Sequence, residues 1–275
     1  MTILLTGSTG FVGKHLKKRL ESDGHVVLSP ARGQIESRHY DVIINCAAEL
    51  TDESKMYSAN VDLVYYLLEL ARNHGVGKVI QIGSSSEYGL TDQPRVESAN
   101  GIPSNIYEST KLAATNLCLG YASRYDLDIC IARPFSVFGP GDKPRKLIPT
   151  LYRSHIDHLT VDLHPGSHDF IYIDDFVDGL MILLNAPKDQ TKGDIINFGT
   201  GVSSSNDQVV AALESALGSS LFVNRKTGRY HSYDVDNWVA DITKARTKYG
   251  WQPKHTLQSG MKAYVMVEWF NGDRG

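Results

Sequence analysis

The segment Thr6–Gly13, which reads TGSTGFVG, constrains the fold of this chain more than any other stretch. It follows the apolar run Ile3–Leu5 and precedes a helical pattern, which is the strand–turn–helix context of a dinucleotide-binding loop. We expect Gly7 to make the tight turn out of the strand, Gly10 to let the backbone approach a pyrophosphate at the helix N-terminus, and Gly13 to let the helix pack on the strand. The other residues of this loop predicted to contact the cofactor are Thr9, Phe11 and Val12.

The composition is that of an ordinary globular protein. The chain has 275 residues, 41% hydrophobic and 21% charged, enough for one large domain or one domain with a lobe. A net charge of −3 gives no reason to expect a nucleic acid or an anionic membrane as partner. No apolar run approaches the roughly 20 residues that span a bilayer, and nothing precedes the first strand, so we expect a cytoplasmic protein without a signal peptide. The three cysteines fit a reducing compartment, and neither they nor the ten histidines have metal-ligand spacing, so no metal site is predicted.

Strands and helices are predicted to alternate along most of the chain. The expected strands are Ile3–Thr6, His25–Leu28, Asp41–Cys46, Lys78–Ile82, Asp128–Ala132 and Ile195–Phe198. The main expected helices are 10–22, 56–74 and 105–124. Such alternation predicts an α/β protein with a Rossmann-type, doubly wound parallel sheet, whose ligands bind outside the carboxyl ends of the strands. We expect this domain to comprise residues 1–140 and the strand near 195–198, and residues 141–275 to form mainly a smaller mixed α/β lobe.

The end of the second strand bears on the choice of cofactor. A Rossmann half usually places an acidic residue there to hold the adenosine ribose, but this chain has Ser29, with Arg32 close by. Because a carboxylate would repel a 2′-phosphate, its absence favours NADP over NAD. Arg32 is equally well read as a solvated loop residue, so NAD is the alternative. Only about a dozen residues then lead to strand 41–46, so the usual third strand and its helix must be trimmed. Ala47 and Ala48, just after that strand, are small enough for close approach to the cofactor.

Tyr107 and Lys111 are four residues apart on a predicted helix and share a face. The ammonium beside the phenol, and a bound nicotinamide cation, would lower the pKa of Tyr107 from its reference near 10 and fit it for acid–base work at a carbinol or carbonyl oxygen. A hydroxyl from Ser84–Ser86 would hydrogen-bond the same oxygen. Most such tyrosine–lysine pairs lie on helix surfaces, but this pair follows a glycine-rich loop and a serine-rich strand end, which favours a catalytic role. The position of Thr6–Gly13 at the first strand, and these matching signals downstream, argue against reading it as an ordinary glycine-rich turn.

These motifs together make the chain resemble the extended short-chain dehydrogenase/reductases of the NAD-dependent epimerase/dehydratase family, which mostly act on nucleotide sugars. The matching segments span nearly the whole chain and are Thr6–Gly13, Ile82–Gly89, Tyr107–Lys111, Arg133–Gly141, Asp169–Asp175, Ala240–Ala245 and Gly250–Pro253. The resemblance implies a Rossmann domain with a C-terminal substrate lobe and a catalytic Ser/Thr–Tyr–Lys set. It selects Ser84, four residues before the tyrosine of the Tyr-Gly pair, and it carries over Tyr107 and Lys111. Ser85 and Ser86 then become candidate substrate contacts.

The resemblance also implies contacts further along the chain. The turn at residues 133–136 would place backbone against the nicotinamide carboxamide, which makes Pro134 and Ser136 candidate cofactor contacts, although Ser136 stands where asparagine is usual. His168 stands where many members have an arginine on the substrate diphosphate. The candidate substrate residues in these later segments are Ser136, His168 and Arg229. Other cations that would supply the missing charge, if they are not merely solvated, are Lys143, Arg145, Lys146, Arg225 and Lys226.

Three functions are weighed on these residues. Ser86 stands where dehydratases of the family carry an acid, and Glu87 follows one residue later, which argues against a 4,6-dehydratase. The pattern and the short crossover are closer to 4-keto-6-deoxy-sugar reductases, so the first reading is hydride transfer from NADPH to C4 of a 4-keto nucleotide sugar, with Tyr107 as proton donor. The alternative is a nucleotide-sugar 4-epimerase with tightly bound NAD. A remote alternative is a non-catalytic redox-sensing or nucleic-acid-binding relative, against which the Tyr107–Lys111 pair argues.

Two further features are interpreted through the resemblance. Asp174 and Asp175 are expected to be structural, at the junction of sheet and lobe, rather than a metal or acid pair. The helices 56–74 and 105–124 occupy positions that often form a dimer interface, so a homodimer is expected. Their apolar stripes would otherwise simply cover the sheet.

Overall fold

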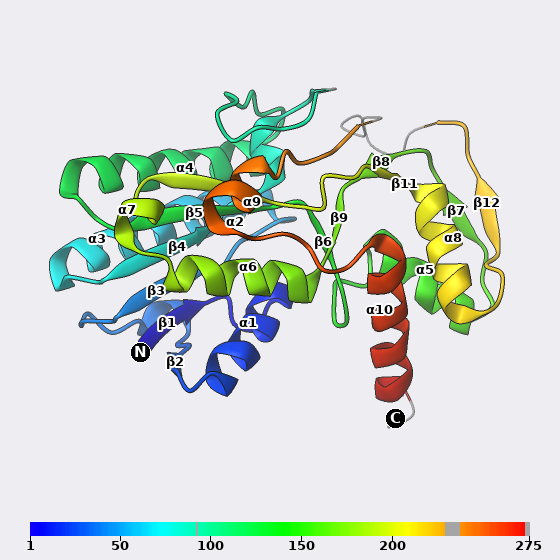
Figure 1. Ribbon diagram of the computed structural model, residues 1–275, viewed down its shortest axis with the longest axis horizontal. Coiled ribbons are helices and arrows are strands. Elements are labelled where there is room, and N and C mark those ends of the chain that lie inside the picture. Colours follow the sequence, from blue (N-terminus) through cyan, green and yellow to red (C-terminus); the bar gives the residue numbers. More distant parts are fainter. Residues whose placement is uncertain (92, 229–236, 273–275) are drawn as a thin grey trace.

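The computed structural model describes residues 1–91, 93–228 and 237–272, and its centre is a parallel sheet of six strands (Figure 1). The strands of this sheet are β1 (Thr2–Thr6), β2 (Val26–Leu28), β3 (Val42–Asn45), β4 (Lys78–Ile82), β5 (Ile129–Pro134) and β10 (Asp194–Phe198). Their order is β10-β5-β4-β3-β1-β2, and every neighbouring pair is parallel. The chain builds outward from β1 in both directions, so the topological switch point, where such sheets bind ligands, lies between β1 and β3.

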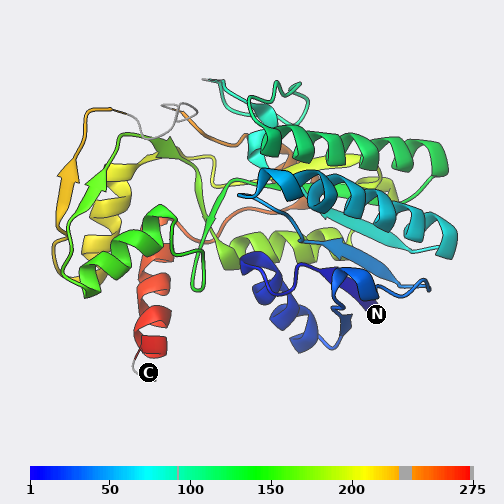
Figure 2. The same ribbon diagram turned by 180° about the vertical axis from the view of Figure 1, so that it is seen from behind.

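Helices cover both faces of the sheet, as the predicted doubly wound fold requires (Figures 1 and 2). On one face lie α3 (Leu63–His74) and α4 (Ile106–Tyr125), and on the other lie α1 (Phe11–Ser22) and α6 (Ile173–Asn185). Side chains alternate along β1, so that Leu4 belongs to the core under α3 and α4 while its neighbours belong to the other core. α6 packs on the sheet although its residues fall within the range assigned mainly to the lobe.

The crossover between β2 and β3 is short, as the sequence predicts. It contains one 3₁₀ turn, η1 (Arg32–Gln34), and β2 is an edge strand of the described sheet. The strand and helix that a complete Rossmann half would insert there are therefore missing from this fold.

The predicted helix 56–74 is built from three pieces. These are α2 (Glu53–Tyr57), the π-helical turn η2 (Ser58–Asp62) and α3. The π turn contains the buried Asn60, whose amide donates to the Glu49 carbonyl and to the Thr110 hydroxyl on α4. The helix ends as predicted at Gly75, which has φ +63° in the left-handed region.

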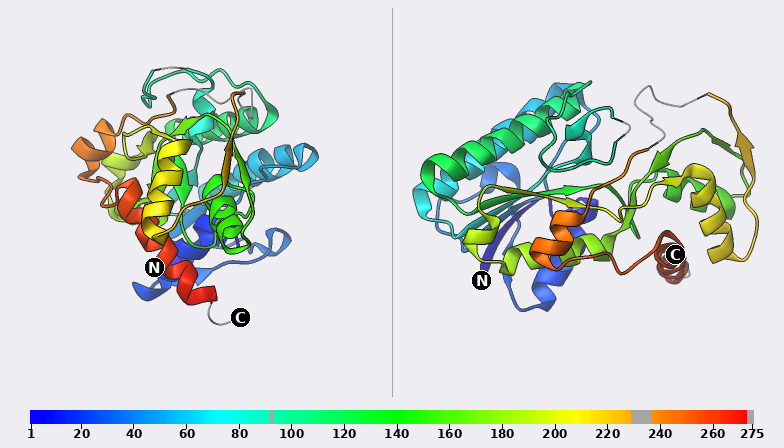
Figure 3. Two further views of the ribbon diagram at one scale, coloured as in Figure 1. Left: turned by 90° about the vertical axis from the view of Figure 1, so that its right-hand side faces the viewer. Right: turned by 45° about the horizontal axis from the view of Figure 1, so that its top comes forward.

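The C-terminal part forms the smaller mixed lobe, beside the sheet in Figures 1 and 3. Its strands form three two-stranded sheets, β6 (Ser136–Phe138) with β9 (Phe170–Tyr172), β8 (Ser167–His168) with β11 (Ser204–Ser205), and β7 (Val161–Leu163) with β12 (Val223–Arg225). The helices of the lobe are α5 (Leu147–Ile156), α8 (Asn206–Leu217) and α10 (Leu257–Gly272), whereas α7 (Lys188–Thr191) and α9 (Thr243–Tyr249) lie by the sheet, where α9 packs against β10. None of the described helices is long and apolar enough to cross a membrane.

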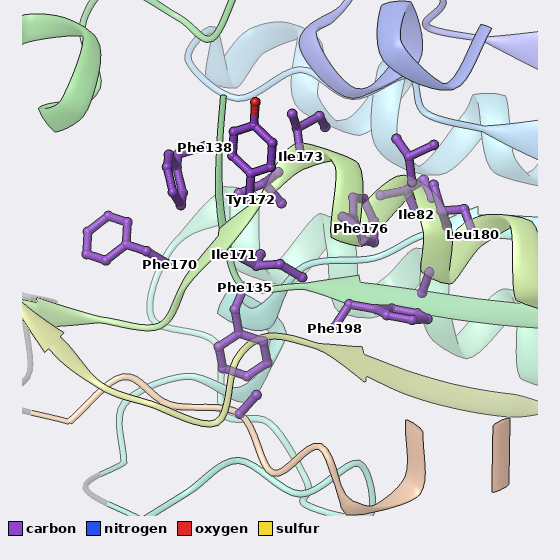
Figure 4. Close-up of a cluster of buried hydrophobic side chains, with 14 of the residues drawn as sticks. Ile82, Phe135, Phe138, Phe170, Ile171, Tyr172, Ile173, Phe176, Leu180 and Phe198 are labelled. Carbon is purple, nitrogen blue, oxygen red and sulfur yellow. The ribbon is translucent and has the colours of Figure 1, made fainter. Parts of the chain in front are cut away.

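An aromatic cluster joins the sheet to the lobe (Figure 4). Phe198, at the end of β10, meets Phe176 of α6 at a ring-centroid distance of 5.6 Å and Trp251 at 4.9 Å. Asp175 lies next to this cluster and accepts hydrogen bonds from the backbone N–H groups of Lys254 and His255. Asp175 therefore anchors the segment before α10, which is the structural role expected for it.

Candidate active site

A cleft of about 760 Å³ opens where the carboxyl ends of the sheet strands face the lobe. It brings together many of the residues singled out from the sequence. Those that line it are Phe11, Val12, Ala48, Ser84, Ser85, Tyr107, Lys111, Pro134, Ser136 and His168. Those that do not line it are Gly7, Thr9, Gly10, Gly13, Ser29, Ala47 and Ser86. The side chain of Arg32 and the whole of Arg229 lie outside the part of the chain that the structure describes.

The glycine-rich loop has the shape expected from its glycines. Gly7 has φ +68°, and a Cβ there would lie 2.5 Å from the Ala47 nitrogen. A Cβ on Gly13 would lie 2.1 Å from the Gly7 carbonyl oxygen, so only glycine lets α1 pack on the turn. A Cβ on Gly10 would meet only that same oxygen, at 3.2 Å, and would otherwise point into open space. The turn and packing roles are confirmed, and the approach to a pyrophosphate stays a prediction.

The N-terminus of α1 is suited to an anionic group. Its N-cap, Gly10, supplies no side-chain hydrogen bond, and its first turn contains no acidic residue. The first N–H groups of the helix therefore lack a side-chain acceptor among the described residues. Ser29 Oγ, where a ribose hydroxyl is expected, is a buried atom without a hydrogen-bond partner in the described structure. Both features fit the adenosine end of a dinucleotide.

Ser84 is held rigidly at the end of β4. It is the N-cap of the 3₁₀ turn η3 (Ser85–Tyr88), and its Oγ accepts from the Ser86 N–H at 3.2 Å. Ser84 Oγ also shares a 2.7 Å hydrogen bond with Ser86 Oγ. The Ser84 N–H donates to Glu87 Oε1 at 2.7 Å, which completes a capping box.

Glu87 fixes this turn to the rest of the site. Its side chain is fully buried, and its Oε2 accepts from Arg133 Nη2 at 2.8 Å, from Arg133 Nε at 3.0 Å and from Thr115 Oγ1 at 2.7 Å. Sequence reasoning noted Glu87 only as a departure from the dehydratase pattern. The capping-box spacing from Ser84 to Glu87 was a signal that could have revealed its anchoring role.

Tyr107 and Lys111 project from the first turns of α4 into the cleft. Lys111 is 3% exposed, and its Nζ donates to the Ile82 carbonyl at 2.6 Å. Burial lowers the pKa of Lys111, and the Glu87 charge opposes this shift. Burial raises the pKa of Tyr107, and a hydrogen bond with Ser84 opposes this shift. The predicted lowering of the Tyr107 pKa is therefore wrong for this structure, because burial outweighs the favourable contacts of the phenolate.

A buried polar chain, which sequence reasoning missed, links the glycine-rich loop to Lys111. The Thr6 hydroxyl donates to Asn45 Oδ1, and Asn45 Nδ2 donates to Gln81 Oε1 at 2.8 Å. Gln81 Nε2 donates to the Ile82 carbonyl at 2.9 Å, the same oxygen that Lys111 contacts. Asn45 and Gln81 face each other in the β3–β4 register. Two amide side chains at the ends of apolar strand runs were the available signal.

Besides Lys111 of α4, the described lysine and arginine side chains that line the cleft come from the lobe. Arg145 and Lys146, at the start of α5, line the cleft. Lys146 lies 3.2 Å from Asp142 and 5.7 Å from the centre of the Phe11 ring. Of the other candidate cations, Arg225 pairs with Asp207 at 2.7 Å and Lys226 pairs with Asp162 at 3.1 Å. In the described part of the chain, no group of three or more His, Cys, Asp or Glu side chains is placed to hold a metal ion.

The sequence matches the model of the NAD dependent epimerase/dehydratase family over residues 3–199. The chain belongs to this family. It is 28% identical, over 99% of both chains, to the low-salt glycan biosynthesis protein Agl12 of Haloferax volcanii. It is 30% identical to the UDP-glucuronate 4-epimerase of Thermodesulfobacterium geofontis, over 75% of this chain and 64% of that protein.

The fold also matches a solved member. MoeE5 in complex with UDP-glucuronic acid and NAD superposes with a TM-score of 0.87 at 24% identity, covering 99% of this chain and 100% of MoeE5. The resemblance inferred from the motifs is thus confirmed. The protein is an NAD(P)-dependent, nucleotide-sugar-modifying enzyme of the extended short-chain dehydrogenase/reductase type.

Proposed function

We propose that this enzyme is a nucleotide-sugar 4-epimerase that retains NAD. The observation that carries the proposal is the convergence of Ser84, Tyr107 and Lys111 on one cleft beside the glycine-rich loop. The epimerase name of a 30%-identical relative supports this reading over the reductase that the motifs alone favour. The buried pairing of Glu87 with Arg133 speaks against a 4,6-dehydratase, because it keeps that carboxylate from the substrate.

The three catalytic side chains divide the proton chemistry. Tyr107 takes the proton of the C4 hydroxyl during oxidation and returns it during reduction. The Ser84 hydroxyl hydrogen-bonds the same oxygen and stabilises charge that develops on it. Lys111, held by the Ile82 carbonyl, lies on the same helix face as Tyr107, where its ammonium would stabilise negative charge that develops on the phenol during proton transfer. NAD held along the glycine-rich loop would supply the acceptor for the C4 hydride and the donor for its return to the opposite face.

The cofactor is proposed to lie along the glycine-rich loop. Its pyrophosphate would meet Gly10 and the N-terminus of α1, and its ribose would meet the Ser29 hydroxyl. Ser29 is neutral, so the end of β2 admits either nicotinamide dinucleotide. The NAD bound to MoeE5 favours NAD over the NADP expected from Ser29 and Arg32. The remaining proposed contacts are Gly7, Thr9, Phe11, Val12, Gly13, Ala47, Ala48, Pro134 and Ser136.

The substrate diphosphate is proposed to bind Arg145, Lys146 and the N-terminus of α5. α5 has no side-chain cap and no acidic residue in its first turn, so cations and free N–H groups converge on the cleft. These groups would take the role of the arginine that many family members have at the position of His168. The sugar would then lie toward Ser84 and Ser85.

A homodimer through 56–74 and 105–124 is also proposed. Both helical segments cover the sheet, yet they keep exposed aromatic and aliphatic side chains. Those exposed on these segments are Tyr57, Tyr65, Tyr66 and Ile106, and Tyr125 is exposed at the end of α4. Light scattering at several protein concentrations will show a dimer if these side chains form an interface.

The function is tested by mixing the purified protein with UDP-glucuronic acid or UDP-glucose, without added cofactor, and following the C4 epimer by NMR. We expect product, NAD released on denaturation and identified by mass spectrometry, and loss of at least about a thousandfold in rate for Tyr107→Phe. Tyr121→Phe, on the same helix but bonded to Glu69, is the matched control. Stoichiometric NADPH consumption with a 4-keto nucleotide sugar would instead establish the reductase.

A further inference from the structure

Ser85 differs from the two serines beside it. Ser84 and Ser86 share a hydrogen bond with each other, whereas Ser85 Oγ accepts from the indole N–H of Trp238 at 3.0 Å. Ser85 is 7% exposed and lines the cleft. Its hydroxyl is thus fixed by a residue 153 positions away in the sequence.

Trp238 is itself held in place by Arg95. The Arg95 guanidinium carbon lies 3.8 Å from the centre of the Trp238 ring, a close cation–π contact. Arg95 is 1% exposed, and its Nη1 donates to the Asn237 carbonyl at 2.9 Å. Trp238 also approaches His168, at a ring-centroid distance of 6.4 Å.

The backbone reinforces this stack. The Arg95 N–H donates to the Val239 carbonyl, and the Asp241 N–H donates to the Arg95 carbonyl, each at 3.0 Å. Asn197 Nδ2, from the end of β10, also donates to the Arg95 carbonyl at 2.8 Å. The loop after η3 and the segment before α9 are therefore pinned together, with Trp238 between them and the serine turn.

Because the indole of Trp238 is the donor in this bond, the Ser85 hydroxyl can still act as a donor. An indole N–H is a donor only, so it occupies a lone pair of Ser85 Oγ and leaves the hydroxyl hydrogen to be given elsewhere. Among the described residues none accepts that hydrogen. Because Ser85 lines the cleft, its hydroxyl is set as a donor toward a ligand there.

We propose that Trp238, held by Arg95, is a positioning residue that orients the Ser85 hydroxyl as a hydrogen-bond donor to an oxygen of the bound sugar ring or its C6 substituent. The inference rests on the proposed nucleotide-sugar substrate. It adds that sugar recognition depends on a side chain that does not itself line the cleft.

The test is a double-mutant cycle of Trp238→Phe and Ser85→Ala, read by calorimetric binding of UDP-glucuronic acid, UDP-glucose and UDP. Phenylalanine keeps a ring under Arg95 but has no N–H. We expect Trp238→Phe to weaken binding of the tighter-bound nucleotide sugar about tenfold, to leave UDP binding unchanged, and to have no further effect in the Ser85→Ala background. Trp251→Phe is the matched control, because it also loses a buried indole bond, to the Asp175 carbonyl, away from the cleft.

Each outcome decides the inference. Additive effects of Trp238→Phe and Ser85→Ala, or equal weakening of UDP and UDP-sugar binding, would show a merely structural tryptophan and overturn it while the proposed function stands. A parent enzyme that binds UDP but neither nucleotide sugar would overturn both. Thermal melting of all variants separates these results from loss of the fold.

Discussion

The carboxylate of Glu87 and the guanidinium of Arg133 form a buried ion pair immediately behind the serine turn, with 2.8 Å between Oε2 and Nη2. The other oxygen of Glu87 accepts a hydrogen bond from the Ser84 N–H, so one side chain links the end of β5 to the backbone of the residue that carries the proposed catalytic hydroxyl. Arg133 also lies 4.5 Å from the centre of the Tyr88 ring. The position of Ser84 is thus set by charge, and not by loop packing alone.

Replacing Glu87 with glutamine should destabilise the protein strongly. The amide keeps the shape but leaves Arg133 as a buried charge without a carboxylate, and removing one partner of a buried pair costs about 3–5 kcal/mol. Urea unfolding will measure the change. Glu36→Gln, which removes an exposed partner of Arg38, should cost less than about 1 kcal/mol. Equal effects of the two substitutions would refute the importance given to the buried pair.

Two glycine-to-alanine substitutions in helices should change the free energy of unfolding in opposite directions. Gly120 of α4 has nothing within 4 Å of a built Cβ, so Gly120→Ala should stabilise by about 0.5–1 kcal/mol through helix propensity. In α6, a Cβ on Gly179 would lie 2.3 Å from Phe198 Cε1, so Gly179→Ala should destabilise by about 1–3 kcal/mol through overpacking. Thermal unfolding of the two variants side by side checks the contrast, and a shift in the same direction for both would contradict it.

Substitution of Gln81 by leucine should break the polar chain between the glycine-rich loop and Lys111. The buried amide of Asn45 would lose its acceptor, at a cost of about 1–3 kcal/mol, and the Ile82 carbonyl would lose its second donor. Gln93→Leu, at an exposed loop position, is a control that should leave stability nearly unchanged. Unfolding free energies within error of each other would show that the chain contributes nothing.

The loss of folding stability at acidic pH should depend in part on Glu49. Its carboxylate accepts from the N–H groups of Thr51, Asp52 and Leu50, and these bonds hold its pKa at about 2. A pKa lowered on folding gives stability that is complete above the unfolded value of 4.5 and is lost as the pH falls toward 2. The stability advantage of the parent over Glu49→Gln should therefore be largest near neutral pH and vanish on acidification. An advantage that is constant from about pH 7 to pH 3 would rule this out.

Local patterns in the sequence were sufficient to predict most of the helices, strands and turns. Gly7 and Gly75 are needed where the backbone enters the left-handed region, and Asn105 caps α4 through the Glu108 N–H. Such features act over a few residues, so their spacing can be read directly. The convergence of Ser84, Tyr107 and Lys111 followed because carboxyl ends of parallel strands meet at one edge.

The features that could not be predicted from the sequence depend on contacts between distant residues and on burial. The bond from Trp238 to Ser85 joins residues 153 positions apart, and no local pattern marks it. The pKa of Tyr107 was predicted to fall because its neighbour Lys111 was considered without the burial that the fold imposes on both. The pairing of Lys226 with Asp162 likewise appears only once β7 and β12 are side by side, and Arg225 pairs with Asp207 at the start of α8.

The short crossover after β2 has a consequence for the behaviour of the protein in solution. Because the strand and helix of a complete crossover are missing, β2 is an edge strand of the sheet. The unpaired backbone groups of an edge strand can pair with a strand of another molecule. β2 has only three residues, however, and so presents a very short row of such groups. The shortened crossover therefore leaves, on this side of the sheet, an edge strand too short to support pairing with a strand of another molecule.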